Sequence, residues 1–116
     1  MPTVVQQQVA DRVGPSGPIP LVEHANVTTM SHWVHLDGLR PWSVTVHRGT
    51  GDTFTARLFV TNNPNAVDGD TAEPQIGVDI TESTALAFDS GWKAVAFQVI
   101  VVFGQHPDVS AYLLIG

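Results

Sequence analysis

No cysteine occurs among the 116 residues, and charged residues are scarce, at 14%. Without thiols the chain forms neither disulfides nor thiolate metal sites, so we expect its folding to be independent of the redox compartment. The charged fraction lies well below the ~25% of an ordinary soluble domain. A surface with so little charge is either covered by uncharged polar side chains or partly buried against another protein.

Clustered basic residues are also missing. The chain has five Lys and Arg against eleven Asp and Glu, and a net charge of −6. Proteins that bind nucleic acid need Lys and Arg gathered on one face to displace counterions from phosphates. We therefore expect neither nucleic acid nor an anionic membrane as a partner. The basic residues are scattered along the chain: Arg12, Arg40, Arg48, Arg57 and Lys93.

A long apolar span is absent as well. Residues 94–103 contain a single polar side chain, Gln98, but a helix that crosses a bilayer needs about 20 apolar residues. The first residues, MPTVVQQQVADRV, lack both a basic segment and a continuous apolar stretch, so we expect no secretory signal.

Alternating apolar residues predict strands, and the turns between them predict two hairpins. Residues 42–46 and 54–60 alternate, and the connection over 48–52 contains two glycines. This spacing predicts a hairpin with Val46 opposite Phe54. Residues 92–103 and 109–115 flank GQHPD, which predicts a second hairpin with Phe103 opposite Val109.

Shorter strands are expected elsewhere, and no segment has a helical period. The prolines and glycines of GPSGPIP, residues 14–20, interrupt any regular element. We therefore expect an extended N-terminal arm over residues 1–19 and a single domain over residues 20–116. The predicted fold class is all-β, an antiparallel β-sandwich or jelly-roll-like barrel. The further strands are expected over residues 20–26, 32–36, 76–80 and 84–88.

The second predicted hairpin is apolar on both faces. Odd positions of 92–103 fill one face, and even positions form a second, less regular apolar surface. Two covers fit that surface: a part of the same chain, either the N-terminal segment or the 62–90 connection, or another subunit. The residues expected at such a subunit interface are Phe59, Ile100, Val102, Tyr112 and Leu114.

The arm has two interpretations. Val4, Val5 and Val9 surround three glutamines, and such an extended segment can add to the sheet edge of another chain. Terminal residues are also commonly without fixed structure.

Residues with catalytic or metal-binding chemistry are sparse. His32 and His35 lie three apart, which in a strand places them on opposite faces. Asp68, Asp70 and Glu73 offer oxygen ligands for calcium, but without the ligand order of an EF-hand, and a solvated turn accounts for them equally. No phosphate-binding loop, dinucleotide motif or nucleophile elbow occurs. We therefore expect no enzyme, no metal and no cofactor.

Residues 42–116 resemble small all-β virion structural proteins of tailed bacteriophages, namely head decoration or cement proteins, minor capsid proteins and related tail proteins. The resemblance is carried by WSVTVHRGTGDTFTARLFV, GWKAVAFQVIVVFG and the closing VSAYLLIG. It implies a structural role in the virion without catalytic residues. Expected partners are the major capsid protein or other virion subunits, with further copies of this chain in a homo-oligomer. The protein would be made in the host cytoplasm.

A second function fits the same fold class. In this alternative the chain is a carbohydrate-binding or host-receptor-binding β-sandwich module of a phage tail or head fibre. Aromatic rings stack on sugars, and Trp33 and Trp92, which lie near strand ends, are the residues expected to bind the ligand.

Overall fold

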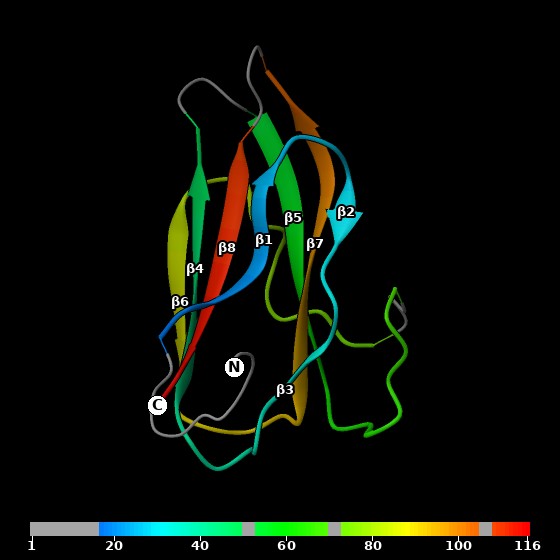
Figure 1. Ribbon diagram of the computed structural model, residues 1–116, viewed down its shortest axis with the longest axis vertical. Helices are drawn as coiled ribbons and strands as arrows, with labels where there is room; N and C mark the ends of the chain where they lie inside the picture. Colours follow the sequence, from blue (N-terminus) through cyan, green and yellow to red (C-terminus); the bar gives the residue numbers. More distant parts are fainter. Residues whose placement is uncertain (1–16, 50–52, 70–72, 105–107) are drawn as a thin grey trace, which may run out of the picture.

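The computed structural model describes residues 17–49, 53–69, 73–104 and 108–116, and within them the protein is all-β. The strands lie in two layers (Figure 1), which confirms the predicted antiparallel β-sandwich. No helix long and apolar enough to cross a membrane occurs in the described residues. The strands are β1 (Ile19–Ala25), β2 (Thr29–Met30), β3 (Val34–His35), β4 (Trp42–Arg48), β5 (Thr53–Thr61), β6 (Thr84–Phe88), β7 (Ala94–Phe103) and β8 (Val109–Ile115).

Each layer is one antiparallel sheet. Sheet A has the order β1-β8-β4-β6. In sheet B, strand β7 lies between β5 on one side and the short β2 and β3 on the other. Strand β8 therefore lies between β1 and β4, although it comes last in the sequence (Figure 1).

The main core lies between the two sheets. In β4 the predicted alternation holds, because Val44 and Val46 are buried while Thr45 between them is half-buried. Strand β8 aligns Leu113 with Val44 and Ala111 with Val46, so both strands direct their apolar side chains inward. The largest fully buried side chains are Phe54, Phe97, Leu58 and Leu113.

Neither predicted hairpin forms, and both pairings are wrong. Val46 pairs with Ala111 and Thr84, whereas Phe54 pairs with Val102 in the other sheet. Strands β4 and β5, which follow each other in the sequence, lie in different sheets, and so do β7 and β8. Val46, Phe54 and Val109 of the predicted pairs do contribute to the core, because apolar faces meet across the two layers as well as side by side. Phe103 does not, since it is 58% exposed.

Strand β7 carries one extra residue relative to β5. Thr55 pairs with Val101 but Ala56 pairs with Val99, so Ile100 is left over in a β-bulge. The bulge reverses the alternation beyond it: Val102 packs against the core, and Val101 is 40% exposed. The prediction that Val101 and Phe103 share the core face of β7 is therefore wrong.

The segment 74–80, predicted as a strand, runs beside β5 without forming a continuous one. Its backbone is hydrogen-bonded to β5 at two places, from the Ile76 amide to the Leu58 carbonyl (2.8 Å) and between Ala56 and Ile80. Between these contacts the chain bends outward, which leaves Val78 85% exposed. This segment occupies the outer edge of β5.

The predicted arm lies largely outside the described residues, which begin at Gly17. The predicted arm contacts Val4, Val5 and Val9 all lie outside the described residues. Strand β1 begins at Ile19, the last residue that the sequence assigned to the arm.

Candidate interaction surfaces

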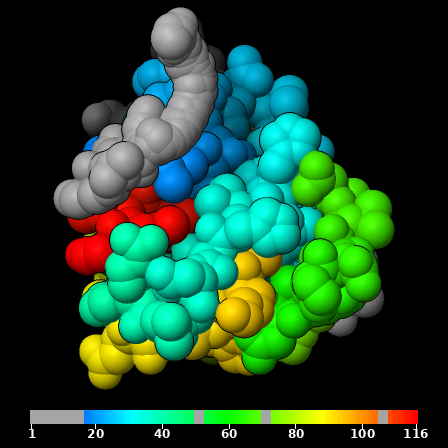
Figure 2. All heavy atoms as spheres, turned by 60° about the horizontal axis from the view of Figure 1, so that its bottom comes forward, coloured from blue at the N-terminus to red at the C-terminus, as the bar shows by residue number. Residues whose placement is uncertain are grey.

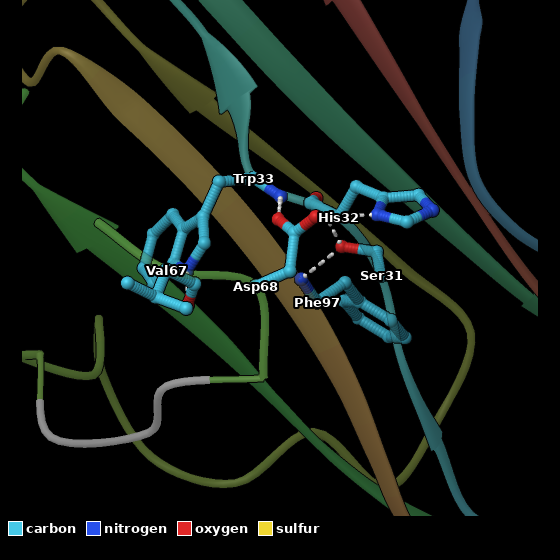
Figure 3. Close-up of polar contacts among 6 residues, drawn as sticks. All are labelled: Ser31, His32, Trp33, Val67, Asp68 and Phe97. Carbon is cyan, nitrogen blue, oxygen red and sulfur yellow. Dashed lines mark hydrogen bonds and ion pairs between the residues drawn. The ribbon is translucent and has the colours of Figure 1, made fainter. Parts of the chain in front are cut away.

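The connection after β5 is fastened to the segment before β3 by Asp68. Its carboxylate accepts hydrogen bonds from the Trp33 amide (2.9 Å) and from the His32 ring nitrogen Nδ1 (2.7 Å), as Figure 3 shows. The Trp33 indole donates to the Val67 carbonyl at 3.2 Å. These hydrogen bonds lower the pKa of the Asp68 carboxyl, the Trp33 amide contributing most and His32 next.

Ser31 fixes the same segment to sheet B. Its amide donates to the Phe97 carbonyl (2.8 Å), and its hydroxyl accepts from the Phe97 amide (2.9 Å) while donating to the His32 carbonyl. Figure 3 shows Ser31 above β7 in this position. Ser31 is buried, so these bonds satisfy polar groups that water does not reach.

The fastened segments cover a second, smaller core on the outer face of sheet B. Trp33, Phe59, Ala94 and Ala96 are buried together there. On the molecular surface the green connection lies next to the cyan segment around residues 30–36 (Figure 2). This part of β7 is therefore apolar on both faces because the chain covers it with its own 62–69 connection.

The five residues predicted at a subunit interface do not share one surface. Phe59 is only 4% exposed and belongs to the second core. Ile100 and Val102 lie on β7 in sheet B, where Ile100 is the bulge residue and Val102 packs against the main core. Tyr112 and Leu114 lie on β8 in sheet A. The structure separates them because β7 and β8 are in different sheets.

Tyr112 and Leu114 instead line a groove on the outer face of sheet A. They alternate with the buried Leu113 and therefore point away from the core. The Tyr112 hydroxyl donates to the Glu23 carboxylate (3.1 Å), and its ring lies edge-on to His47 with 6.3 Å between centroids. The groove holds about 450 Å³ and is lined by Pro18, Pro20, Glu23, Ser43, Thr45, His47, Tyr112 and Leu114.

This groove has little charge. With histidine counted as neutral, Glu23 is the only charged residue in the described part of the groove lining, and Glu23 accepts the Tyr112 hydrogen bond. Leu114 is 40% exposed, and Ala85 and Ala87 on the neighbouring edge strand are exposed as well. The outer face of sheet A is thus suited to contact another protein surface of low charge.

Neither tryptophan of the alternative function is fully exposed. Trp33 is 8% exposed beneath the 62–69 connection. Trp92 packs partly against the main core and has a backbone φ of 64°, a conformation that L-residues rarely adopt. A sugar-stacking platform requires an open ring face, which Trp33 lacks.

The titratable residues do not gather into a metal site in the described part of the chain. Both oxygens of Asp68 are engaged by His32 and Trp33, and Asp70 lies outside the described residues. His24 contacts Asp108 at 2.9 Å on the exposed surface. The role of Asp68 in fastening Trp33 could not be read from the sequence, because the two residues lie 35 positions apart.

The two layers of antiparallel strands define a small all-β sandwich. No protein-family model matches the chain, and no curated protein matches its sequence. The solved structure of the SPBc2 prophage-derived protein YomS is similar in fold, with a TM-score of 0.64 and 15% sequence identity. The similarity covers 92% of this chain and 99% of YomS.

Proposed function

We propose that this chain is a structural subunit of a bacteriophage particle, a capsid decoration, cement or minor capsid protein that docks on a larger protein assembly and stabilises it. The observation that carries the proposal is the outer face of sheet A. There Tyr112 and Leu114 point into a groove in which Glu23 is the only formally charged residue among the described ones. The similarity in fold to a prophage-derived protein supports the phage setting.

Docking would bury this face against another virion subunit. Burying about 400 Å² of apolar surface corresponds to roughly 10 kcal/mol before the costs of association, which remove much of that gain. A single contact of this size binds weakly, but many copies on one particle add avidity. A subunit with a low-charge sheet face suits this docking role.

The experiment compares Leu114→Asp with Leu39→Asp. Leu114 lies in the groove at 40% exposure, whereas Leu39 is 83% exposed in the turn before β4. Both variants place a carboxylate on an exposed leucine, so both should keep the fold, which circular dichroism and urea unfolding would check.

Particles are purified on density gradients from cells that carry the gene in its phage or prophage context, and the chain is quantified by mass spectrometry. We expect the unmodified chain and Leu39→Asp in the particle fraction, and Leu114→Asp reduced about tenfold or more, which corresponds to about 1.4 kcal/mol. Absence of the unmodified chain from purified particles would refute the structural role. Equal incorporation of both variants would refute the proposed docking face.

A further inference from the structure

The groove on the outer face of sheet A contains a carboxylate that an irregularity in β1 places there. Pro20 is aligned with Tyr112 but Val22 with Ala111, so β1 has one extra residue between them. The extra residue reverses the alternation: Val22 is buried in the core, and the next residue, Glu23, is exposed and lines the groove. The Glu23 carboxylate accepts a hydrogen bond from the Tyr112 hydroxyl at 3.1 Å.

Glu23 differs from other carboxylates of the protein in its hydrogen-bond donor. Asp37 and Asp79 each accept a hydrogen bond from an arginine side chain. Among the described residues, the donor to Glu23 is the neutral hydroxyl of Tyr112, and the described groove lining contains no Lys or Arg. A carboxylate accepts several hydrogen bonds, so a positive side chain is the expected complement of this groove.

The described chain enters this groove directly after a turn signal. Pro18 and Pro20 line the groove, and Figure 1 shows this blue segment passing over β8 and β4. Gly17 has a φ of 87°, in the left-handed region. The sequence of residues 14–17, GPSG, is typical of a type I turn, with proline second and glycine fourth. A type I turn followed by a left-handed residue closes a three-residue hairpin loop, which returns the chain alongside itself.

The register of such a loop brings Arg12 to the groove. With residues 15–17 as the loop, position 14 lies opposite 18, and Arg12 lies opposite Pro20. Pro20 is aligned with Tyr112, so Arg12 would continue this row across the outer face, next to the partner of Glu23. Arg12 is the only Lys or Arg before Gly17.

We propose that residues 10–13 of the same chain, which lie outside the described residues, cover this groove in the free subunit, with the Arg12 guanidinium on the Glu23 carboxylate. The short loop favours the same chain, because it holds Arg12 near the groove at a high effective concentration. Pro18 and Pro20 have no amide hydrogen to donate, so side chains rather than a full strand ladder would hold the segment.

The cover would regulate the docking that is proposed for this groove, and the inference rests on the proposed function in that respect. An exposed ion pair contributes little binding energy. A virion subunit that buries the groove could therefore displace the segment, and the free subunit would not expose Tyr112 and Leu114 to other proteins before docking.

The first test captures the ion pair covalently. In Arg12→Lys, a carbodiimide can join the new amine to a carboxylate that contacts it. We expect an amide between residues 12 and 23, identified by peptide mass spectrometry, and its loss when Glu23→Gln is added. Glu73→Gln is the matched control, because Glu73 precedes the Pro74 carbonyl that bonds to β5 in the other sheet. Absence of the 12–23 product from Arg12→Lys, or equal yields with Glu23→Gln and Glu73→Gln, would overturn the proposal.

Mixing isotopically labelled and unlabelled chains before the reaction shows which chain supplies residue 12. A link within one chain joins two peptides of the same isotope. Products that join a labelled to an unlabelled peptide would place a second copy in the groove and overturn the proposal.

Tyr112 is the only tyrosine of the chain and reports whether the groove is covered. Arg12→Glu places a like charge next to Glu23 and should raise the rate of Tyr112 nitration about threefold. Arg40→Glu is the control, because Arg40 pairs with Asp37 in the turn before β4. Circular dichroism checks that both variants keep the fold. Equal nitration rates for the two variants would overturn the cover.

These outcomes are distinguishable from those of the proposed function. A 12–23 product in a chain that never enters particles would refute the virion role and leave the cover standing. Entry into particles that Leu114→Asp prevents, without a 12–23 product in the free subunit, would overturn the cover alone.

Discussion

The Asp68 carboxylate accepts the Trp33 amide hydrogen at 2.9 Å, although the two residues lie 35 positions apart in the chain. This bond holds the 62–69 connection over the outer face of sheet B, where Trp33 and Phe59 are buried. We therefore expect Asp68→Ala to lower the urea midpoint of unfolding, because a half-buried amide loses its acceptor. Asp68→Asn retains one carbonyl oxygen and should lower it less.

Asp79→Ala is the control, since its carboxylate accepts exposed hydrogen bonds from the side chains of Arg57 and Gln75. Exposed pairs of this kind contribute little to stability. Equal midpoints for Asp68→Ala and Asp79→Ala would contradict the fastening role of Asp68.

Acid should destabilise the protein partly through Asp37. The amide of Leu39 and then the Arg40 side chain and amide hold the pKa of the Asp37 carboxyl at about 2, below the ordinary 3.8. A carboxyl whose folded pKa is depressed stabilises the fold above its unfolded pKa, and that contribution is lost as the pH falls through the folded one. Urea unfolding between pH 5 and pH 2, about the window of these two values, should show a steeper decline for the unmodified protein than for Asp37→Asn. Parallel declines would exclude this contribution.

The main core should be sensitive to truncation at Phe97. This side chain is fully buried at the centre of β7. We expect Phe97→Ala to lower the free energy of unfolding by about 3–5 kcal/mol, from lost burial and the cavity left behind. Leu39→Ala, at an 83% exposed position, should change it by less than about 0.5 kcal/mol. Urea titration followed by tryptophan fluorescence measures both, and comparable losses would contradict the assigned core.

The bulge in β7 predicts opposite sensitivities at neighbouring valines. Val102 packs against the core, while Val101 is 40% exposed. Replacing valine by threonine keeps the shape and adds a hydroxyl, so Val102→Thr should cost about 1 kcal/mol and Val101→Thr less than about 0.5 kcal/mol. A larger loss of stability for Val101→Thr than for Val102→Thr would contradict the bulge and support the uninterrupted alternation that the sequence alone predicts.

The strands of β4, β5, β7 and β8 could be predicted because alternation and β-branched residues mark half-buried sheet positions locally. Their partners could not be predicted in the same way. The inward-facing side chain of Val46 is buried equally well by a neighbour in its own sheet and by a side chain from the opposite sheet. The alternation of apolar residues therefore does not distinguish a hairpin from a crossing between layers.

The predicted surface residues also depend on contacts that the local sequence does not report. Tyr112 and Leu114 were expected beside Ile100 and Val102 through a pairing that does not form, yet they do face outward on sheet A. Phe59 looked available for a partner, but its cover comes from Trp33 and the connection that Asp68 fastens. No local signal in the sequence reports a contact between residues so far apart.

The position of β8 between β1 and β4 has a consequence for how the chain matures. During translation β1 emerges early but has no neighbour within its sheet until residues 109–115 leave the ribosome. Closing so large a loop is entropically expensive and therefore slow. Nascent chains should thus expose the unpaired edge of β1 until residues 109–115 have been made, and such an edge makes an incomplete chain prone to aggregate.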